Sequence, residues 1–418
     1  MSDLFEKLVK DGGPIGQHMK RAHGYFAFPK LEGELGNRMM FRGREKIIWS
    51  LNNYLGMANH PMARKADADA AAKWGMGYPM GARMMSGNST LHDQLETVIA
   101  DFVNKEDCML LNFGYQGIMS CIDALVNRRD VIVYDTESHA CIVDGIRLHM
   151  GYSYAYKHND MEDCEKQLTR AVKMTEKSGG AILLITEGVF GMAGDQGKLK
   201  EIVALKNKYP FRILIDDAHG FGSMGPTGAG ADEEQGCQDG IDLYFSTFVK
   251  SMGCIGAFIA GPKDVLSYLR YNTRSQIFAK SLPMIIVEGM LKRMEMLKTL
   301  PELKEKLWFN VNKLQNGLKE RGFDIGKTNS PVTPVYMKGD VPEATAMILD
   351  LRENFNIFCS IVVYPVIPRG QIIFRLIPTA THTDEDIELT LHAFSETKKK
   401  LDAGEYKAAE IPNMAEVM

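Results

Sequence analysis

Lys250 is the residue in this sequence whose type and position most suggest covalent chemistry. It follows the apolar run DLYFS at 242–246 and lies in a turn of mostly small and apolar residues, TFVKSMG at 247–253. Removal from water favours the neutral amine of a lysine, and a neutral amine can form a Schiff base with an aldehyde. An arbitrary lysine is more simply a surface side chain whose ammonium group reaches water. The interpretation of Lys250 therefore depends on its neighbours in the fold.

Two other apolar runs lead into ionisable side chains. FRILID at 211–216 ends in Asp216, with Asp217 and His219 close behind, and DVIVY at 130–134 is followed by His139. A carboxylate buried at a strand end is costly without a cation nearby, so Asp216 predicts a cationic partner. His139 would lie at the edge of the crevice where ligands bind in a parallel sheet. Taken alone, it is more simply a hydrogen-bonded structural histidine.

A fourth run indicates an anion site. CMLLN at 108–112 is followed by FGYQG at 113–117 and then by a helical pattern, which places free backbone N–H groups at a helix start where a phosphate could bind. Glycine after a strand often marks only a turn, so this signal is weak by itself. The four strand ends together fit pyridoxal 5′-phosphate (PLP). This cofactor needs an amine, a carboxylate, a stacking ring and phosphate donors.

The elements that must position these residues follow an α/β pattern. Short apolar runs alternate with helical patterns such as 91–103 and 161–174, which predicts a mainly parallel sheet covered on both faces. A long helical stretch at about 284–320, strand-like segments at 330–337 and 370–378, and a helix from Asp384 to about Leu401 predict a smaller α+β domain. We expect an N-terminal segment at 1–58, a large PLP-binding domain at 59–290 and a small domain at 291–418.

Composition excludes several classes of function. The 418 residues carry a formal net charge of −4 with acids and bases interspersed, which argues against nucleic acid or an anionic membrane as partner. We find neither a signal peptide nor an apolar run long enough for a membrane span, so we expect a cytoplasmic protein without integral membrane association. The seven cysteines are scattered without metal-ligand spacing, which predicts reduced thiols and no metal site.

The sequence resembles the α-oxoamine synthase family of fold-type I PLP enzymes from about residue 24 to residue 401. The similar segments are NNYLG at 52–56, GMGYPMGAR at 75–83, SG at 86–87, HDQLE at 92–96, DDAHGFG at 216–222, TFVKS at 247–251, YPVIP at 364–368 and FRL at 374–376. This resemblance implies a seven-stranded, mainly parallel sheet with helices on both faces and a smaller C-terminal domain. It also implies a homodimer with its sites at the subunit interface.

The resemblance implies a role for each candidate residue. Lys250 would bind PLP covalently and move the α-proton, while Asp216 would keep the pyridine nitrogen protonated. His139 would stack on the ring and help to orient the substrate carboxylate, and His219 would bond the phenolic oxygen. The remaining implied ligands are Gly114, Tyr115, Thr247 and Ser281 for the phosphate, and Arg375 and Asn53 for the amino acid.

The implied reaction joins an amino acid to a long-chain acyl thioester, on coenzyme A or acyl carrier protein, with loss of carbon dioxide. Serine would give a 3-keto sphingoid base and cysteate a sulfonolipid precursor, and the sequence leaves the two open. Glycine or alanine as substrate, a PLP aminotransferase and a PLP-free scaffold are the alternatives. The segment YPVIP argues against an aminotransferase, and the presence of Lys250 argues against a scaffold.

Four positions depart from the family pattern. Val249, Gly191 and Ala279 stand where hydroxyl residues are usual, which puts hydrogen bonds to the phosphate and near the ring oxygen in doubt. In the family, the segment that resembles FAKSLP at 278–283 reaches the phosphate of a second subunit. Lys280 adds a cation to this segment, and with Arg369 it could pair with a sulfonate. A surface ion pair is the simpler interpretation of either residue.

Overall fold

The computed structural model describes residues 3–16 and 22–408, which form two compact units. The sheet unit comprises Asn52–Leu307, and the terminal unit comprises Met1–Leu51 with Trp308–Met418. The expected boundaries at 58 and 290 differ from these. β3 (Arg44–Ile48) pairs with β12 (Ile357–Phe358), so the N-terminal strands belong to the same sheet as a C-terminal strand. α13 (Met284–Thr299) packs on α4 (Pro61–Trp74) and therefore belongs to the sheet unit.

The sheet unit is built on seven strands in the order β4-β10-β9-β8-β7-β5-β6. β10 (Ala257–Gly261) is antiparallel to both of its neighbours, and the other pairings are parallel. The mainly parallel seven-stranded sheet is confirmed. The remaining strands are β4 (Asp107–Leu111), β5 (Val131–Asp135), β6 (Tyr152–Tyr156), β7 (Ile182–Glu187), β8 (Arg212–Asp216) and β9 (Leu243–Thr247).

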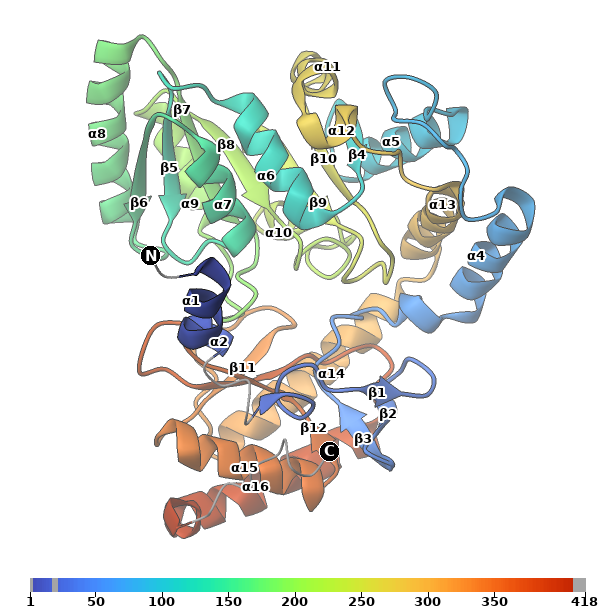
Figure 1. The fold of residues 1–418 in the computed structure, drawn as a ribbon, viewed down its shortest axis with the longest axis vertical. Coiled ribbons are helices and arrows are strands. Elements are labelled where there is room, and N and C mark those ends of the chain that lie inside the picture. Colours follow the sequence, from blue (N-terminus) through green and yellow to red (C-terminus); the bar gives the residue numbers. More distant parts are fainter. Residues whose placement is uncertain (1–2, 17–21, 409–418) are drawn as a thin grey trace. The chain divides into compact units, whose positions relative to one another are not determined.

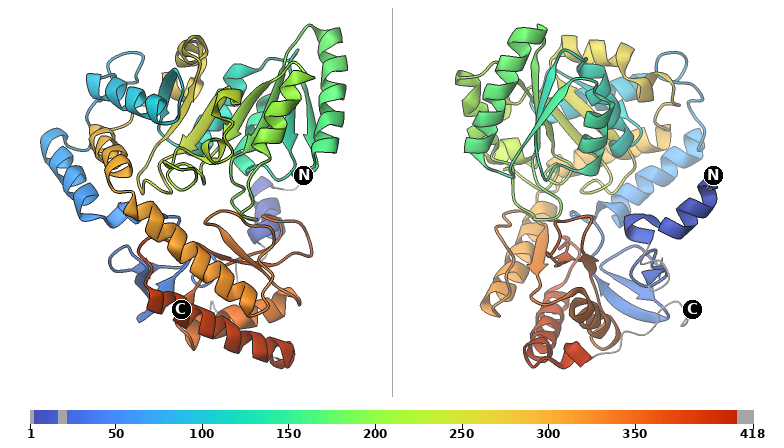
Figure 2. Two further views of the ribbon diagram at one scale, coloured as in Figure 1. Left: turned by 180° about the vertical axis from the view of Figure 1, so that it is seen from behind. Right: turned by 60° about the vertical axis from the view of Figure 1, so that its left-hand side comes forward.

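Helices cover both faces of this sheet, as expected (Figures 1 and 2). Buried side chains of α6 (Gly114–Leu125), α7 (Ala140–Leu148) and α11 (Lys263–Asn272) form one apolar core with the strands. The other helical segments are η1 (Met57–Asn59), α5 (Thr90–Phe102), α8 (Met161–Ser178), α9 (Leu199–Ala204), η2 (Leu205–Asn207), α10 (Ala231–Glu234), η3 (Gln238–Gly240) and α12 (Arg274–Ile277). Within the described residues, no helix is long and apolar enough to span a membrane.

The parallel strands bring their carboxyl ends to one edge of the sheet. Asp135, Glu187, Asp216 and Thr247 are the last residues of β5, β7, β8 and β9. Glu187 and Asp216 lie opposite each other in the register of β7 and β8. Leu111 of β4 and Thr247 both pair with Ala257 of β10, so the start of α6 lies close to the end of β9. This edge therefore collects the predicted site residues of the sheet unit.

The terminal unit contains two small sheets with helices packed on them. The sheets have the strand orders β1-β2-β3-β12 and β11-β14-β13. Their strands, apart from β3 and β12, are β1 (Leu31–Glu32), β2 (Arg38–Phe41), β11 (Thr333–Tyr336), β13 (Ser360–Val362) and β14 (Ile373–Leu376). The helical segments are α1 (Leu4–Asp11), α2 (Gly13–Gly16), α15 (Val341–Glu353), α16 (Asp384–Asp402) and η4 (Glu405–Ala408).

The predicted helix at 284–320 is two helices. α13 ends at Thr299 and α14 (Glu302–Glu320) starts after Pro301, whose ring and missing N–H cannot continue a helix. α14 begins in the sheet unit and ends in the terminal unit. Within the seven-stranded sheet, β6 is the strand that the apolar runs did not predict. Tyr152 and Ser153 on this edge strand are exposed, so it carries no continuous apolar run.

Candidate active site

Asp216 is a buried carboxylate at the end of β8. Its Oδ1 accepts the backbone N–H of Ala218 at 3.0 Å. Burial raises the pKa of Asp216, while the positive charges that Lys250 and His139 can carry act in the opposite direction. Lys250 is thus a side chain that can act as the predicted cationic partner of Asp216 when it is protonated. The next residue, Asp217, points to the other side of the strand, where its Oδ2 accepts bonds from Ala231 N and Tyr244 Oη, both at 2.8 Å.

His139 is the residue that begins helix α7. Its Nδ1 lies 3.3 Å from the backbone nitrogen of Cys141 and 2.9 Å from the Cys141 thiol. Its own backbone N–H donates to Glu187 Oε1 at 2.5 Å. Burial lowers the pKa of the His139 ring, Asp216 raises it, and Lys250 lowers it again, and the net direction is downward. The ring is therefore held at a helix start as a neutral imidazole.

Glu187 is a second buried carboxyl at this edge, and sequence reasoning did not single it out. Burial and the facing Asp216 raise its pKa well above the usual range, and the bond from His139 N only partly offsets them. The available signal was the same as for Asp216, an acid directly after an apolar strand, ILLITE at 182–187. Cys141 was also missed, because a scattered cysteine gives no sign of a histidine beside it.

Lys250 lies in a tight turn after β9. The turn is closed by bonds from Cys254 N to Phe248 O at 2.9 Å and from Gly253 N to Lys250 O at 3.0 Å. Gly253 has a φ of +57°, and a Cβ there would lie 2.5 Å from Ala58 N. A larger residue at this position would strain the backbone and collide with its neighbour. Lys250 is half-buried, and Val249 beside it is exposed.

The predicted phosphate cradle is the start of α6. Phe113 precedes the helix in an extended conformation, and no side chain caps the first turn. A Cβ on Gly114 would come within 3.3 Å of Cβ and Oγ1 of Thr247, so glycine lets the helix start approach the end of β9. Uncapped N–H groups at a helix start bind anions. Gly114 and Thr247 are thus brought together, and the role of Gly114, Tyr115 and Thr247 in binding a phosphate remains a prediction.

Ser281 lies in the segment that follows α12 of the same chain. Its N–H donates to Gly81 O at 3.0 Å, and the Asn112 side chain, next to Phe113, donates to Lys280 O. Ser281 Oγ is buried and has no hydrogen-bond partner among the described residues. An orphaned buried hydroxyl has hydrogen-bonding capacity that a bound phosphate group can use. The Lys280 side chain is exposed.

His219 is oriented by a tyrosine. Its Nδ1 lies 2.7 Å from Tyr54 Oη, and both side chains are buried. A Cβ on Gly191 would lie 2.4 Å from His219 Nε2. The His219 ring therefore occupies the space that a serine side chain at position 191 would need. This gives a physical reason for glycine where the family usually has a hydroxyl.

The loop that carries Gly191 is fixed by an ion-pair network that the sequence did not predict. His158 Nδ1 lies 2.9 Å from Asp135 Oδ1, and His158 Nε2 lies 2.9 Å from Asp195 Oδ2. Burial lowers the pKa of His158, but bonds and attraction from the two aspartates outweigh burial and raise it to about 10. The His158 ring also packs edge-on against Phe190, with centroids 4.4 Å apart.

Two predicted substrate ligands have local partners. Asn53 Oδ1 accepts the N–H of Ala58 at 3.1 Å, which fixes the turn before η1. Arg375 lies in the terminal unit, buried in β14, where the pairing strands place Pro334 and Ser360 beside it. Their roles as ligands of the amino acid remain predictions. Among the described residues, no cluster of His, Cys, Asp and Glu could hold a metal ion.

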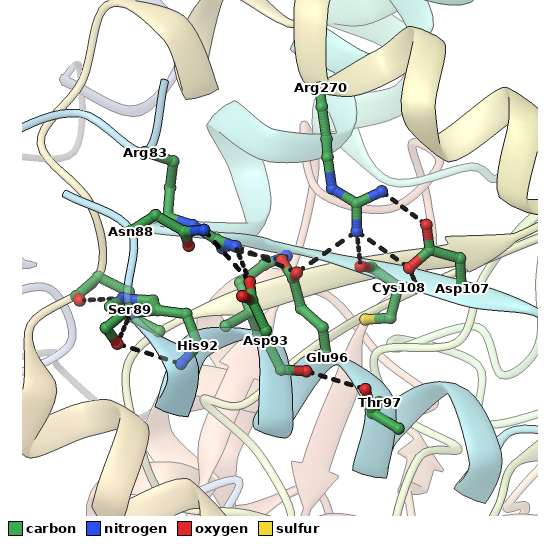
Figure 3. Close-up of polar contacts among 12 residues, drawn as sticks. Arg83, Asn88, Ser89, His92, Asp93, Glu96, Thr97, Asp107, Cys108 and Arg270 are labelled. Atoms are coloured by element: carbon green, nitrogen blue, oxygen red, sulfur yellow. Dashed lines mark hydrogen bonds and ion pairs between the residues drawn. The ribbon is translucent and has the colours of Figure 1, made fainter. Parts of the chain in front are cut away.

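The glycine-rich segment 75–88 is anchored by the Arg83 cluster, which consists of Arg83, Asp93, Glu96, Asp107 and Arg270 (Figure 3). The two terminal nitrogens of Arg83 lie 2.8 and 3.1 Å from the two oxygens of Glu96. Arg270 contacts Glu96 at 3.3 Å and binds Asp107 at 2.6 and 3.0 Å. Glu96 Oε1 also accepts the N–H of Leu110 in β4 at 2.8 Å. The cluster thus ties the segment to α5, β4 and α11.

Comparison with known proteins decides the family. Residues 44–394 match the family described as aminotransferase class I and II. The chain belongs to this family. A cysteate-C-fatty acyltransferase from Capnocytophaga ochracea is 63% identical over 98% of this chain and 97% of that protein. An 8-amino-7-oxononanoate synthase from Thermoanaerobacter pseudethanolicus is 37% identical over 92% of this chain and 96% of that protein.

Solved structures extend the likeness to the fold. A serine palmitoyltransferase from S. paucimobilis, solved with PLP and myriocin, has a TM-score of 0.88 and 30% identity, and the match covers 96% of this chain and all of that one. The resemblance to α-oxoamine synthases and the fold-type I architecture are confirmed. The chain is a PLP-dependent acyltransferase. The residues that would hold PLP fit it, because the edge of the sheet offers an uncapped helix start, an orphaned hydroxyl and a buried carboxylate.

Proposed function

We propose that this protein condenses cysteate with a fatty acyl thioester and releases carbon dioxide, a free thiol and a sulfonated aminoketone. The observation that carries the proposal is the 63% identity, over nearly the whole of both chains, to a protein named cysteate-C-fatty acyltransferase. The arrangement of Asp216, His139 and Lys250 at one edge of the sheet supports the PLP chemistry that this reaction needs. Serine is the second candidate, because several relatives are serine palmitoyltransferases at 33–35% identity.

Bound PLP would supply an electron sink for the α-carbon of the amino acid, which can then lose its proton and attack the acyl thioester. Lys250 Nζ would hold the cofactor covalently and, when the amino acid displaces it, would accept the α-proton. Asp216 would hold a proton on the pyridine nitrogen, since a buried carboxylate with raised pKa gains most from a cation beside it. The same protonated ring nitrogen would relieve the cost of burying Asp216.

The other residues would bind and orient. The N–H groups of Gly114 and Tyr115, with the hydroxyls of Thr247 and Ser281, would hold the phosphate. His219, fixed by Tyr54, would donate to the phenolic oxygen. His139 would lie against the ring and bond the substrate carboxylate, and the resemblance implies Arg375 and Asn53 as ligands of the amino acid.

We further propose that Lys280 binds the sulfonate that distinguishes cysteate from serine. It is an exposed cation whose backbone is held beside Asn112, next to the phosphate cradle. A charge-assisted bond to a sulfonate is stronger than a neutral one, so a lysine here favours the anionic substrate. Arg369, whose guanidinium lies 4.5 Å from the centre of the Tyr364 ring, is the other candidate for this role.

We also propose that the protein acts as a homodimer in the cytoplasm. The segment around Ser281 resembles the one that reaches a second subunit in the family. All seven cysteines are free thiols, which fits a reducing compartment. Sedimentation equilibrium of the PLP-loaded protein tests the dimer, and a monomeric mass at micromolar concentration would refute it.

Thiol release tests the proposed function. The PLP-loaded protein is incubated with acyl-CoA or acyl carrier protein thioester and with cysteate, serine, glycine or alanine in turn. We expect cysteate to give the highest kcat/KM. Lys280→Ala should raise the KM for cysteate about tenfold, because one charge-assisted bond is lost. The KM for serine should not change. Lys263→Ala, on the exposed surface of α11, is the control. A higher kcat/KM for serine would refute the choice of cysteate.

A further inference from the structure

The two contacts of His139 Nδ1 determine which ring nitrogen carries the proton. The backbone nitrogen of Cys141, at 3.3 Å, can only donate a hydrogen bond. A protonated Nδ1 would place two N–H groups opposite each other, so this contact favours Nδ1 as the acceptor. The longer distance makes this backbone bond weak, and by itself it would hold the ring only loosely.

The Cys141 thiol supplies the second and closer contact. Its Sγ lies 2.9 Å from His139 Nδ1 and 4.0 Å from Asp216 Oδ2, so the imidazole is the better placed acceptor. Burial, with Asp216 and Glu187 adding to it, raises the pKa of Cys141, and the thiol therefore keeps its proton and can donate. The ring is neutral because its own pKa is lowered. A neutral imidazole that accepts at Nδ1 carries its hydrogen on Nε2.

The backbone of His139 is fixed as well. Its N–H donates to Glu187 Oε1 at 2.5 Å, and Glu187 is buried at the end of β7. The Tyr115 ring packs edge-on against the imidazole, with centroids 6.1 Å apart, and the Tyr115 hydroxyl bonds Asp144 of α7. The charged and titratable groups around the ring are thus Asp216, Lys250, Glu187, Tyr115 and Cys141 itself. Among these groups, within the part of the chain that the structure describes, the Cys141 thiol is the one in hydrogen-bond contact with a ring nitrogen of His139.

We propose that Cys141 is a positioning residue that fixes His139 as its Nε2–H tautomer, so that the ring presents a donor to the carboxylate of the amino-acid substrate. This inference rests on the proposed function, in which His139 meets that carboxylate. The thiol itself touches neither substrate nor cofactor. Its effect should therefore appear only with ligands that carry a carboxylate.

A pair of ligands separates this role from a merely structural one. Cysteate and taurine both have an amine and a sulfonate, and only cysteate has a carboxylate. Titration of each into the PLP-loaded protein, followed by the change in visible absorbance, gives two dissociation constants. We expect Cys141→Ala and Cys141→Val to raise the dissociation constant of cysteate about tenfold, because one well-aligned donor is lost. The dissociation constant of taurine should not change. Cys141→Ser keeps a donor and should restore cysteate binding.

Cys164→Ala removes a buried thiol from α8, away from any ring contact with His139, and should leave both constants unchanged. Equal weakening of cysteate and taurine in Cys141→Ala would overturn the proposal, because it would show a general disturbance of the site. Unchanged cysteate binding would overturn it as well. If the wild type responds to no amino acid, the proposed function fails instead.

The tautomer can also be observed without cofactor or activity. A long-range ¹H–¹⁵N spectrum of the apo-protein labelled with ¹⁵N-histidine, assigned with His139→Gln, should show His139 as the Nε2–H form in the wild type and Cys141→Ser. Cys141→Ala should show an increased share of the Nδ1–H form. An Nδ1–H ring in the wild type would contradict the proposal.

Discussion

Two groups of buried acids in the sheet unit are satisfied in opposite ways. In the Arg83 cluster, Glu96 receives bonds from two arginines and from the backbone of Leu110 (Figure 3). At the carboxyl ends of the strands, Glu187 and Asp216 face each other, and each accepts a backbone N–H. Burial raises the pKa of both Glu187 and Asp216.

The difference separates a structural brace from a ligand site. A buried acid with complete ion pairs fixes its surroundings and has nothing left to offer a ligand. A buried acid that lacks a full ion pair costs stability, and a cation delivered by a ligand can recover that cost. Substitutions in the two groups, and in the contacts that support them, should therefore affect either stability or activity.

Asp216→Asn should have the largest effect. Without a carboxylate to hold the proton on the pyridine nitrogen, kcat/KM should fall about 10³-fold, the size of the loss of a preorganised electrostatic contact. The stability of the apo-protein should not fall, because the substitution removes a desolvated charge. The pKa of Asp216 is higher in the folded protein than in the unfolded chain. The free energy of unfolding of Asp216→Asn should therefore increase relative to that of the wild type as the pH rises above the unfolded pKa of about 3.9. Thiol release and urea unfolding measure the two effects.

Asp217→Asn is the matched control for that prediction. Asp217 is adjacent in the sequence, but its bonds to Ala231 and Tyr244 lie on the other side of β8. We expect it to keep most of its activity. A collapse of activity equal to that of Asp216→Asn would contradict the separate roles of the two aspartates.

Glu96→Gln should show the reverse pattern. It leaves Arg83 and Arg270 without their shared carboxylate, and loss of one partner of a buried ion pair costs about 3 kcal/mol in the free energy of unfolding. Urea unfolding should show this loss, while PLP binding to the folded protein should persist. Glu305→Gln, on α14, is a control without a described salt bridge. An unchanged unfolding free energy in Glu96→Gln would refute the stabilising role of the Arg83 cluster.

His158→Gln tests the network that fixes the loop around Gly191. The loss of charge-assisted bonds to Asp135 and Asp195 should cost about 2 kcal/mol at pH 6. Because the folded pKa of His158 is raised to about 10, this contribution is complete below the unfolded pKa of about 6.5 and is lost as pH rises through 10. The difference in unfolding free energy between wild type and variant should therefore shrink from pH 6.5 to 10. If this difference in unfolding free energy grew from pH 6.5 to 10, it would contradict the ion pairs of His158 with Asp135 and Asp195.

Tyr54→Phe should have the smallest effect. It removes one hydrogen bond to His219 Nδ1, which is worth about 1 kcal/mol, so kcat/KM should fall about fivefold to tenfold. Tyr244→Phe removes a buried hydroxyl that bonds Asp217 and Ala229, and it should lower the unfolding temperature with less effect on activity. The same loss of activity in both variants would argue against a specific role for Tyr54.

The sequence was sufficient to predict much of the sheet unit. The apolar runs before Gly114, His139, Asp216 and Lys250 each form a strand, because buried parallel strands are apolar along their whole length. Parallel strands then bring those residues to one edge. β6 was not predicted because an edge strand needs no continuous apolar run. The break at Pro301 was not predicted because the sequences on both sides of it have the same helical pattern.

The rest of the candidate site could not be predicted because it depends on contacts between distant residues. Neither the pairing of Cys141 with His139 nor that of His158 with Asp195 leaves a pattern in a single sequence. The Arg83 cluster was visible only as a run of family residues, and its physical role required Arg270 from α11. The unit boundaries depend on which helix packs on which, as α13 and α4 show.

The central claim is that Lys250 holds PLP at the edge of the sheet where Asp216 lies. The most direct test is the visible absorbance of the purified protein with PLP, before and after borohydride reduction, in the wild type and Lys250→Ala. We predict a Schiff-base band in the wild type, with the reduced cofactor attached to the peptide that contains Lys250, and neither in the variant. A labelled peptide that contains a different lysine, or a wild type without the band, would contradict the account.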